Sequence, residues 1–395
     1  MNRFTPGNEV ELLRSGAAYF PALVAAVDAA EREVWLETYI LADDPAGRAV
    51  VEALVRAASR GVAVRLLVDG WGAKHYLTKR LERQLGEGGV YLLKYRPEVQ
   101  PWHFRSHRLR RLHRKLCHVD ARVAFVGGIN LIDDMNTPGH RPPRVDFAVR
   151  LRGPLVASIV QTMQRLWALN ELVQFRTSDV PLFPDLVPTG RAGAQTAKFT
   201  IRDNLRHRRD IERAYLAGIR VARREILIAN AYFFPGVRFR HALMDAARRG
   251  VAVTLLLQAK VEYRLLHYAS RALYGQLIGA GIAIQEYRRS FLHAKVAVID
   301  DRWATVGSSN IDPYSLLMAR EANVFVRDAR FADALRSELR AMIDDGARPV
   351  VTRRRLGRSL ASKALCWIAY GIVRAGMGLL GYGGNEWWGG RPRKR

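Results

Sequence analysis

Residues 113–130 read HRKLCHVDARVAFVGGIN, and residues 293–310 read HAKVAVIDDRWATVGSSN. His, Lys, Asp, Gly and Asn recur at the same relative places, and each residue of the first stretch lies 180 positions before its counterpart (113 against 293, 130 against 310). One such pattern would be weak evidence, but two in register indicate an internal duplication. The chain is therefore predicted to fold as two similar halves.

The hydrophobic pattern predicts the same order of elements in both halves. Residues 33–41 (EVWLETYIL) and 61–68 (GVAVRLLV) are typical of strands, and residues 47–60 between them have helical spacing. The same order recurs over residues 225–257, and the pentapeptide RGVAV occurs once in each half. Strand, helix and strand in this order predict an α/β fold, in which each half is a mostly parallel mixed sheet flanked by helices.

Length and proline content suggest the domain boundaries. At 395 residues the chain is longer than a single hydrophobic core usually sustains. Pro181, Pro184 and Pro188 fall in a short polar stretch that suits a linker. We therefore expect a first domain at 1–185 and a second domain at 186–350. Residues 351–395 would form a basic and apolar tail.

The composition is strongly basic. The chain has 63 Lys and Arg against 37 Asp and Glu, a formal net charge of +26. Such a charge attracts polyanions, either nucleic acid or an anionic membrane surface, and does not choose between them. The two cysteines, Cys117 and Cys366, are far apart and imply neither a disulfide framework nor a zinc site.

The end of the chain departs from the duplicated pattern. Residues 364–373 (ALCWIAYGIV) and 375–380 (AGMGLL) are apolar, but Arg374 interrupts them. Each piece is shorter than the ~20 residues that span a bilayer. Two tryptophans and a basic run follow. We predict that this tail lies at a membrane surface; the alternative is a helix docked on the protein's own core.

The motif spacing places its functional side chains together. On a strand, His and Lys two positions apart face the same side. A two-residue turn at Ala121 and Arg122 would put Asn130 opposite His113, and the same count would put Asn310 opposite His293. Lys charge, Asn donors and glycines that let a phosphate approach the backbone suit phosphate chemistry. Asp120 and Asp300 would fall at the turns and stabilise them.

A catalytic imidazole needs a partner that fixes its tautomer. Asp146 lies 33 residues after His113, and Glu321 lies 28 residues after His293, each on a predicted strand. We expect each carboxylate to support the histidine of its own half.

These paired His-x-Lys-x4-Asp motifs resemble those of the phospholipase D superfamily. Within it, the phrases ETYILADDPAGRAV, RGVAVRLLVDGWG, NAYFFPG and FLHAKVAVIDDRWATVGSSNIDPYS resemble bacterial cardiolipin synthases, especially the shorter B type. The resemblance covers about residues 8–345. It departs at Gly128, where the usual residue is Ser, as at Ser308.

The resemblance implies one active site at the pseudo-two-fold interface of the halves. The catalytic residues that it implies are His113, Lys115, Asp120, His293, Lys295 and Asp300, and the phosphate-binding residues are Asn130, Ser308 and Asn310. His113 would attack phosphorus and form a phosphohistidine, and His293 would act as acid and then base. Neither a metal nor another cofactor is expected.

The function implied is phosphatidyl transfer from phosphatidylglycerol to a second phospholipid alcohol, which forms cardiolipin and releases glycerol. The expected partners are anionic phospholipids such as phosphatidylglycerol and a membrane surface, and no nucleic acid. The expected location is the cytoplasmic face of the inner cell membrane, as a peripheral protein. Alternatives are a phospholipase D-type phosphodiesterase, a nuclease and an inactive lipid-binding scaffold. The apolar tail argues against the nuclease, and two intact motifs argue against the scaffold. The sequence names neither the acceptor alcohol nor the oligomeric state.

Overall fold

The structure is a computed structural model that describes residues 3–97, 110–176, 190–203, 206–260, 263–312, 319–351 and 360–377. The prolines of the predicted linker lie outside these ranges. Of the predicted tail, residues 352–359 and 378–395 also lie outside them.

The described part of the first half carries nine strands and four helices. The strands are β1 (Thr5–Arg14), β2 (Glu33–Thr38), β3 (Ala63–Asp69), β4 (Tyr91–Tyr95), β5 (Arg111–Leu112), β6 (Lys115–Val119), β7 (Val123–Gly127), β8 (Arg144–Val145) and β9 (Phe147–Arg152). The helices are α1 (Ser15–Asp28), α2 (Pro45–Ser59), α3 (Lys79–Glu87) and α4 (Val156–Gln174).

The described part of the second half repeats this plan. Its strands are β10 (Gln195–Arg202), β11 (Glu225–Asn230), β12 (Ala252–Gln258), β13 (Ala283–Tyr287), β14 (Phe291–Leu292), β15 (Lys295–Ile299), β16 (Trp303–Gly307), β17 (Ala319–Arg327) and β18 (Ala347–Pro349). Its helices are α5 (Asp210–Val221), α6 (Val237–Arg248), α7 (Arg264–Ala272), α8 (Tyr274–Gly279), α10 (Ala329–Gly346) and α11 (Leu360–Met377).

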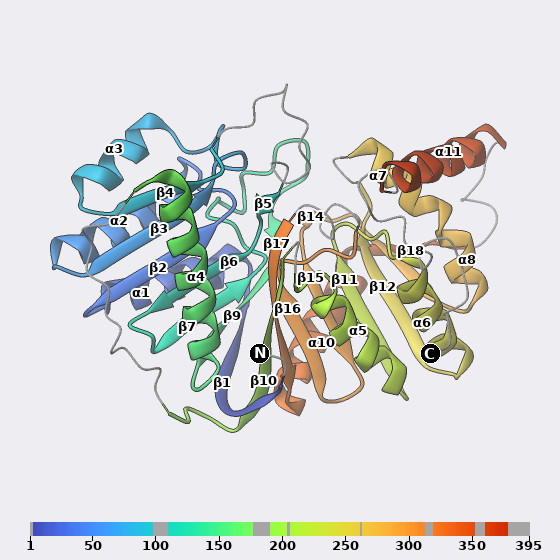
Figure 1. The fold of residues 1–395 in the computed structure, drawn as a ribbon. Coiled ribbons are helices and arrows are strands. Elements are labelled where there is room, and N and C mark those ends of the chain that lie inside the picture. Colours follow the sequence, from blue (N-terminus) through green and yellow to red (C-terminus); the bar gives the residue numbers. More distant parts are fainter. Residues whose placement is uncertain are drawn as a thin grey trace.

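Most strands of both halves join in one continuous sheet, whereas β8 and β14 form a separate two-stranded sheet and β5 pairs with β17 off the main path. The order of the continuous sheet is β18-β13-β12-β11-β15-β16-β17-β10-β1-β9-β7-β6-β2-β3-β4. Apart from the terminal strand β18, this order reads the same outward from the β10–β1 contact in both directions, as a duplication about a pseudo-two-fold axis requires. Figure 1 shows the two halves side by side, with β1 and β10 between them. The expected duplicated α/β fold is confirmed.

Within each half, parallel pairing is confined to the outer strands. β2, β3 and β4 pair in parallel, as do β11, β12 and β13, whereas the inner strands of each half pair antiparallel. The sheet is therefore mixed, with more antiparallel pairing than expected. The reason is that only the outer strands are joined by helical crossovers, whereas each motif forms a tight hairpin, which must be antiparallel.

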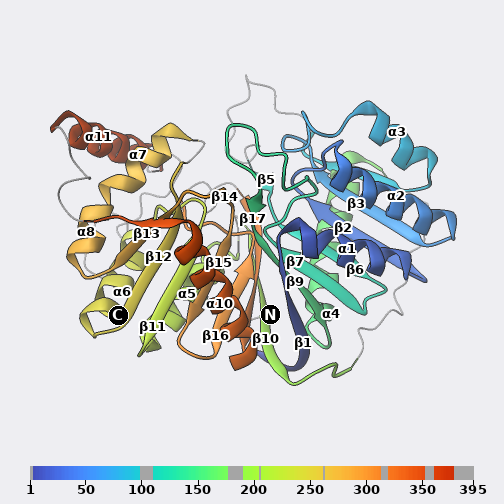
Figure 2. The ribbon, with the colours of Figure 1, turned by 180° about the vertical axis from the view of Figure 1, so that it is seen from behind.

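Local sequence features, such as capping residues, mark where the helices that cover the sheet begin. In α2, Asp44 accepts a hydrogen bond from the Gly47 N–H, and Pro45 occupies the first turn. Val50, Leu54 and other apolar residues at helical spacing are fully buried. Figure 1 shows α4 in front of the sheet of the first half, and Figure 2 shows α10 on the opposite face of the second half. Both helices pack on the core that spans the two halves.

Each motif hairpin has a three-residue turn rather than the predicted two-residue turn. Val119 pairs with Val123, and Ile299 pairs with Trp303, so Lys115 lies opposite Gly127. The predicted register was wrong by one position, and Asn130 is not placed opposite His113. The longer turn fits the left-handed backbone at Asp120, where φ is 51°.

Asp120 and Asp300 fix the turns to neighbouring strands. Asp120 accepts hydrogen bonds from the backbone N–H groups of residues 31, 32 and 33 at 2.8–2.9 Å. Asp300 does the same for residues 223, 224 and 225 at the start of β11. Each aspartate is at the far end of its strand from the motif histidine, and a catalytic role for either stays a prediction. Their role in the structure is to hold the hairpin turns.

Candidate active site

His113 and His293 each follow a two-residue strand that pairs with the opposite half. β5 pairs in parallel with the start of β17, and the His113 N–H donates to the Arg320 carbonyl at 3.0 Å. β14 pairs in parallel with β8, and the His293 N–H donates to the Val145 carbonyl at 2.8 Å. Both histidines therefore lie at the interface of the two halves.

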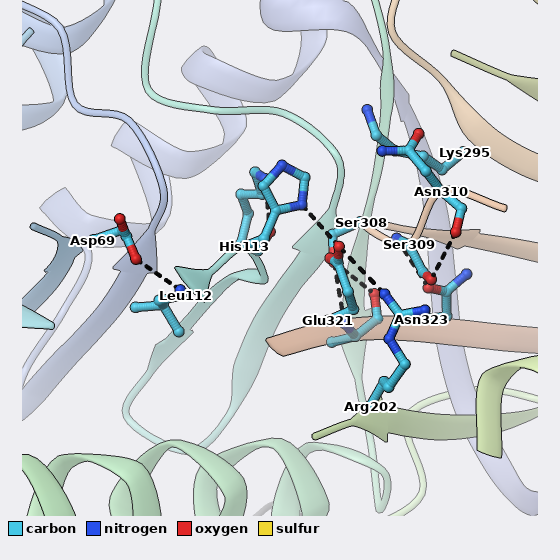
Figure 3. Close-up of polar contacts among 12 residues, drawn as sticks. Asp69, Leu112, His113, Arg202, Lys295, Ser308, Ser309, Asn310, Glu321 and Asn323 are labelled. Atoms are coloured by element: carbon cyan, nitrogen blue, oxygen red, sulfur yellow. Dashed lines mark hydrogen bonds and ion pairs between the residues drawn. The ribbon is translucent and has the colours of Figure 1, made fainter. Parts of the chain in front are cut away.

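The carboxylates that hold the histidines are exchanged between the halves. His113 Nδ1 lies 2.9 Å from Glu321 Oε1, and His293 Nδ1 lies 2.6 Å from Asp146 Oδ2. Figure 3 shows the His113–Glu321 contact. Our expectation that each carboxylate supports the histidine of its own half was wrong. The backbone bonds explain the exchange, because each histidine N–H is fixed to the residue immediately before the other half's carboxylate.

A carboxylate on Nδ1 leaves Nε2 available for chemistry. When Nδ1 donates its proton to the carboxylate, Nε2 of a neutral imidazole is an acceptor and a nucleophile. Burial lowers the pKa of both histidines, and Lys295 lowers both further. The pKa of His293 falls to about 3, although Asp146 opposes the shift. The buried site thus favours neutral imidazole before substrate charge is present.

Both carboxylates are buried and remain ionised. Burial by itself would raise the pKa of Glu321, but His113, Arg202 and Lys115 outweigh it and hold this pKa at about 2. The pKa of Asp146 is likewise lowered, because Lys295 and His293 outweigh its burial. Each carboxylate can therefore stabilise positive charge when its histidine gains a proton or a phosphoryl group.

The motif lysines are buried beside the histidines. Lys115 Nζ donates to the His113 carbonyl at 2.6 Å and lies 5.5 Å from the centre of the Tyr39 ring. Lys295 Nζ donates to Asp146 Oδ2 at 3.1 Å and also contacts His293. Burial lowers the pKa of Lys115 to about 7 and lowers that of Lys295 as well. The charge of Lys295 also lowers the pKa of Lys115, which indicates that the two motifs share one site.

Two copies of one motif, brought together across the halves, match a known family. The family described as "Cardiolipin synthase, PLD-like domain" matches residues 23–140 and 215–343. The chain belongs to this family. The two matched ranges of this phospholipase D-like protein contain His113 and His293, one each.

Characterised relatives and one solved structure resemble most of the chain. Cardiolipin synthase B of Escherichia coli is 39% identical over 347 residues, which cover 85% of this chain and 81% of the relative. The major cardiolipin synthase of Bacillus subtilis is 31% identical over 338 residues, 84% of this chain and 68% of the relative. The crystal structure of phosphatidylserine synthase from Haemophilus influenzae superposes with a TM-score of 0.67 at 12% identity, over 94% of each chain, and shows the shared fold.

The polar residues after each motif strand are buried at the site of this phospholipase D-like protein. Among the described residues, the side-chain oxygens of Asn130 and Asn310 have no hydrogen-bond partner. A carboxamide can present either its oxygen or its NH2 group by rotation, so both asparagines can serve a ligand. The hydroxyl of Ser308 donates to Glu321 instead. Its observed contact is with the carboxylate that holds His113, and its contact with a phosphate stays a prediction.

Several neighbours of the catalytic residues lie outside the two phosphate-type stretches or between their motif positions. The ring of Tyr39 packs edge-on against His113 at 5.0 Å. Arg202, on the adjacent strand β10, lies 3.6 Å from Glu321, and Figure 3 shows its side chain rising toward Glu321 from below. Arg114, between the motif His and Lys, forms a buried ion pair with Glu37. Only the pairing of distant strands reveals these contacts.

The described residues contain neither a metal-binding cluster nor a membrane-spanning helix. In the part of the chain that the structure describes, no three His, Cys, Asp or Glu side chains are grouped so that they could hold a metal ion. Over the same ranges, no helix is both long and apolar enough to cross a membrane.

Proposed function

We propose that this chain is a cardiolipin synthase that transfers a phosphatidyl group from phosphatidylglycerol to a second phospholipid alcohol and releases glycerol. The observation that carries the proposal is the pair of half-buried histidines, each held at Nδ1 by a buried carboxylate of the opposite half. Two equivalent imidazoles suit a reaction that needs a nucleophile and a proton carrier at one phosphorus. The curated cardiolipin synthases that resemble most of the chain support the same activity.

In the first step, His113 Nε2 attacks the phosphorus of phosphatidylglycerol. The N–P bond forms as the bond from phosphorus to the glycerol oxygen breaks. His293, which takes up a proton once the negative phosphate of the lipid is bound, gives that proton to the glycerol oxygen. Glycerol leaves, and the phosphatidyl group stays on His113. Glu321 stabilises the phosphorylated imidazolium, and Asp146 supports the charged state of His293 before transfer.

In the second step, the hydroxyl of another phospholipid headgroup takes the place of glycerol. Neutral His293 removes its proton as the oxygen attacks phosphorus, and the N–P bond to His113 breaks. The product is cardiolipin when the acceptor is a second phosphatidylglycerol. His293 is again protonated, so the cycle is balanced without an external acid or base.

The remaining motif residues suit the charge of the transferring phosphoryl group. Lys115 and Lys295 supply positive charge in a buried site, where it acts more strongly than in water. The carboxamides of Asn130 and Asn310 add hydrogen-bond donors. We also keep the domain division at residues 185 and 350 as part of the proposal, because it places one motif in each domain.

Helix α11 supports a peripheral position on an anionic phospholipid surface. Ala369 and Val373 are buried in the second-half core, whereas Trp367, Ile368 and Ile372 are more than half exposed. A helix that packs one apolar stripe on the protein and exposes another suits the interface of a bilayer. Together with the net charge of +26, it favours an anionic membrane on the cytoplasmic side over nucleic acid as the partner.

Purified full-length protein with vesicles of phosphatidylglycerol tests the proposed function. The expected products are cardiolipin and free glycerol in equal amounts, measured by lipid mass spectrometry and an enzymatic glycerol assay. Added glycerol should lower the net yield because it drives the reverse reaction. Phosphatidic acid as the dominant product would make the enzyme a phospholipase. Cleavage of DNA or RNA without lipid turnover would make it a nuclease.

A further inference from the structure

Gly128 and Ser308 occupy equivalent places in the two halves. Each follows the last residue of a motif strand, β7 or β16. The Gly128 N–H donates to the Phe147 carbonyl at 2.9 Å, and the Ser308 N–H donates to the Ala322 carbonyl at 3.0 Å. Phe147 and Ala322 directly follow the two carboxylates that hold the histidines. The two halves therefore differ at two neighbouring places. The side chain at residue 128 differs from that at residue 308, and the carboxylate beside it is shorter in the first half than in the second.

In the second half, the Ser308 hydroxyl fills the gap between a long carboxylate and the backbone. The Ala322 N–H donates to Ser308 Oγ at 3.1 Å, and the hydroxyl donates to Glu321 Oε2. The other carboxylate oxygen, Oε1, holds His113. The hydroxyl thus relays a backbone hydrogen bond to Glu321 and fixes the oxygen that does not touch the histidine.

In the first half, the shorter carboxylate makes the same bond directly. The Phe147 N–H donates to Asp146 Oδ1 at 2.8 Å, and Asp146 Oδ2 holds His293 and Lys295. A Cβ atom added to Gly128 would lie 2.4 and 2.5 Å from the two oxygens of Asp146. The space beside Gly128 is therefore filled by the carboxylate and is not open to a phosphate.

Space, not backbone conformation, accounts for the glycine. Gly61 and Gly153 have positive φ angles, which other residues rarely adopt, but Gly128 does not. Any residue could adopt the backbone conformation at this position. The three heavy atoms nearest to an added Cβ all belong to the carboxylate of Asp146, which therefore excludes a side chain.

We infer that Gly128 with Asp146, and Ser308 with Glu321, are two matched units that position the catalytic histidines across the interface. In each unit a backbone N–H anchors one carboxylate oxygen, so that the other oxygen points at the histidine of the opposite half. Aspartate makes the bond directly and needs glycine beside it, whereas glutamate needs a hydroxyl to complete the bond. Gly128 and Ser308 are positioning residues and act on catalysis through the carboxylates.

A double-mutant cycle in the first half tests the matching. We expect Gly128→Ser to displace Asp146 and lower kcat by about 10- to 100-fold, and Asp146→Glu to lower it similarly for lack of space. The double variant G128S/D146E recreates the second unit. Its kcat should be at least tenfold higher than the two single losses multiplied together would give. A coupling of this size is within the range seen between contacting residues. Gly275→Ser is the matched control, because a Cβ there meets nothing within 4 Å.

The reciprocal cycle adds no atoms and avoids a failure to fold. Ser308→Gly removes the relay and Glu321→Asp shortens the carboxylate, so each should lower kcat. In S308G/E321D the shorter carboxylate can accept directly from the Ala322 N–H, and kcat should rise above that of either single variant. Additive losses in both cycles, or wild-type kcat in every single variant, would overturn the matching.

Histidine titration provides a readout that a merely structural role would not change. Asp146 raises the pKa of His293, so its displacement in G128S should lower that pKa, and the double variant should restore it. The titration is followed by ¹⁵N NMR of histidine-labelled protein with thermal melting as a folding check. An unchanged His293 pKa in folded G128S would count against the inference.

The inference rests on the proposed function only for the kcat assay. Absence of cardiolipin with the wild-type protein would reject the proposed function, whereas the NMR titration needs no substrate and still decides the matching of the two units.

Discussion

Replacing Asp146 by Asn should disable His293, although Asp146 belongs to the half that contains His113. Asp146 Oδ2 accepts from His293 Nδ1 at 2.6 Å and from Lys295 at 3.1 Å. Asn keeps the shape but removes the charge, and its NH2 group toward Nδ1 would move the ring proton to Nε2. That tautomer can neither accept a proton from nor attack a substrate at Nε2.

The expected loss is about 10⁴-fold in kcat, by analogy with the loss of the histidine-orienting aspartate in a catalytic triad. This corresponds to about 5.5 kcal/mol of activation free energy. Stability should also fall by about 3–5 kcal/mol, because Lys295 loses its partner in a buried ion pair. The pKa of Asp146 is lowered in the folded protein. The stability that it contributes is therefore present above its unfolded pKa and is lost as the pH falls through the folded value.

The assay follows initial rates of cardiolipin formation, histidine ¹⁵N shifts against pH, and denaturant unfolding at several pH values. In D146N the pKa of His293 should fall, since Asp146 raises it, while His113 should titrate as in the wild type. In Glu321→Gln the pKa of His113 should change, while His293 should titrate as in the wild type. Asp245→Asn, at an exposed residue, is the matched control. A shift at His113 with His293 unchanged in D146N would refute the crossed arrangement.

Three further predictions concern the catalytic pair, the turns and the tail. His113→Ala and His293→Ala should each lower kcat by more than about 10²–10⁴-fold, the usual cost of losing a general acid or base; near-normal turnover in either variant, measured by lipid mass spectrometry, would exclude a shared site. Asp120→Ala should lower the free energy of unfolding by at least ~1–3 kcal/mol, because three backbone N–H groups lose their acceptor. Its kcat below the melting transition should stay near the wild-type value, and a large kcat loss in folded protein would support a catalytic role. The double substitution Ile368→Glu and Ile372→Glu should weaken sedimentation with anionic vesicles without lowering the melting temperature; undiminished binding at physiological salt would show that this helix face does not contact the membrane.

The sequence was sufficient for features that depend on local spacing. The duplicated motifs and the strand and helix order around them follow from periodicities that each segment carries by itself. The same spacing indicated the family, because the family's motif is defined by residues at fixed distances along the chain. The turn of three residues was missed because a two-residue and a three-residue turn differ by one position, which the sequence pattern does not distinguish.

Contacts between distant segments decided the rest. The exchange of Asp146 and Glu321 between the histidines depends on two-residue strands that pair across the halves, and such short strands carry no recognisable sequence period. The positions of Asp120 and Ser308 depend in the same way on which distant backbone or carboxylate lies beside them. The sequence by itself determined that there are two phosphate-type motifs in two similar halves. Tertiary structure alone decided which carboxylate serves which histidine, because hydrogen bonds between strands are satisfied in space and not along the chain.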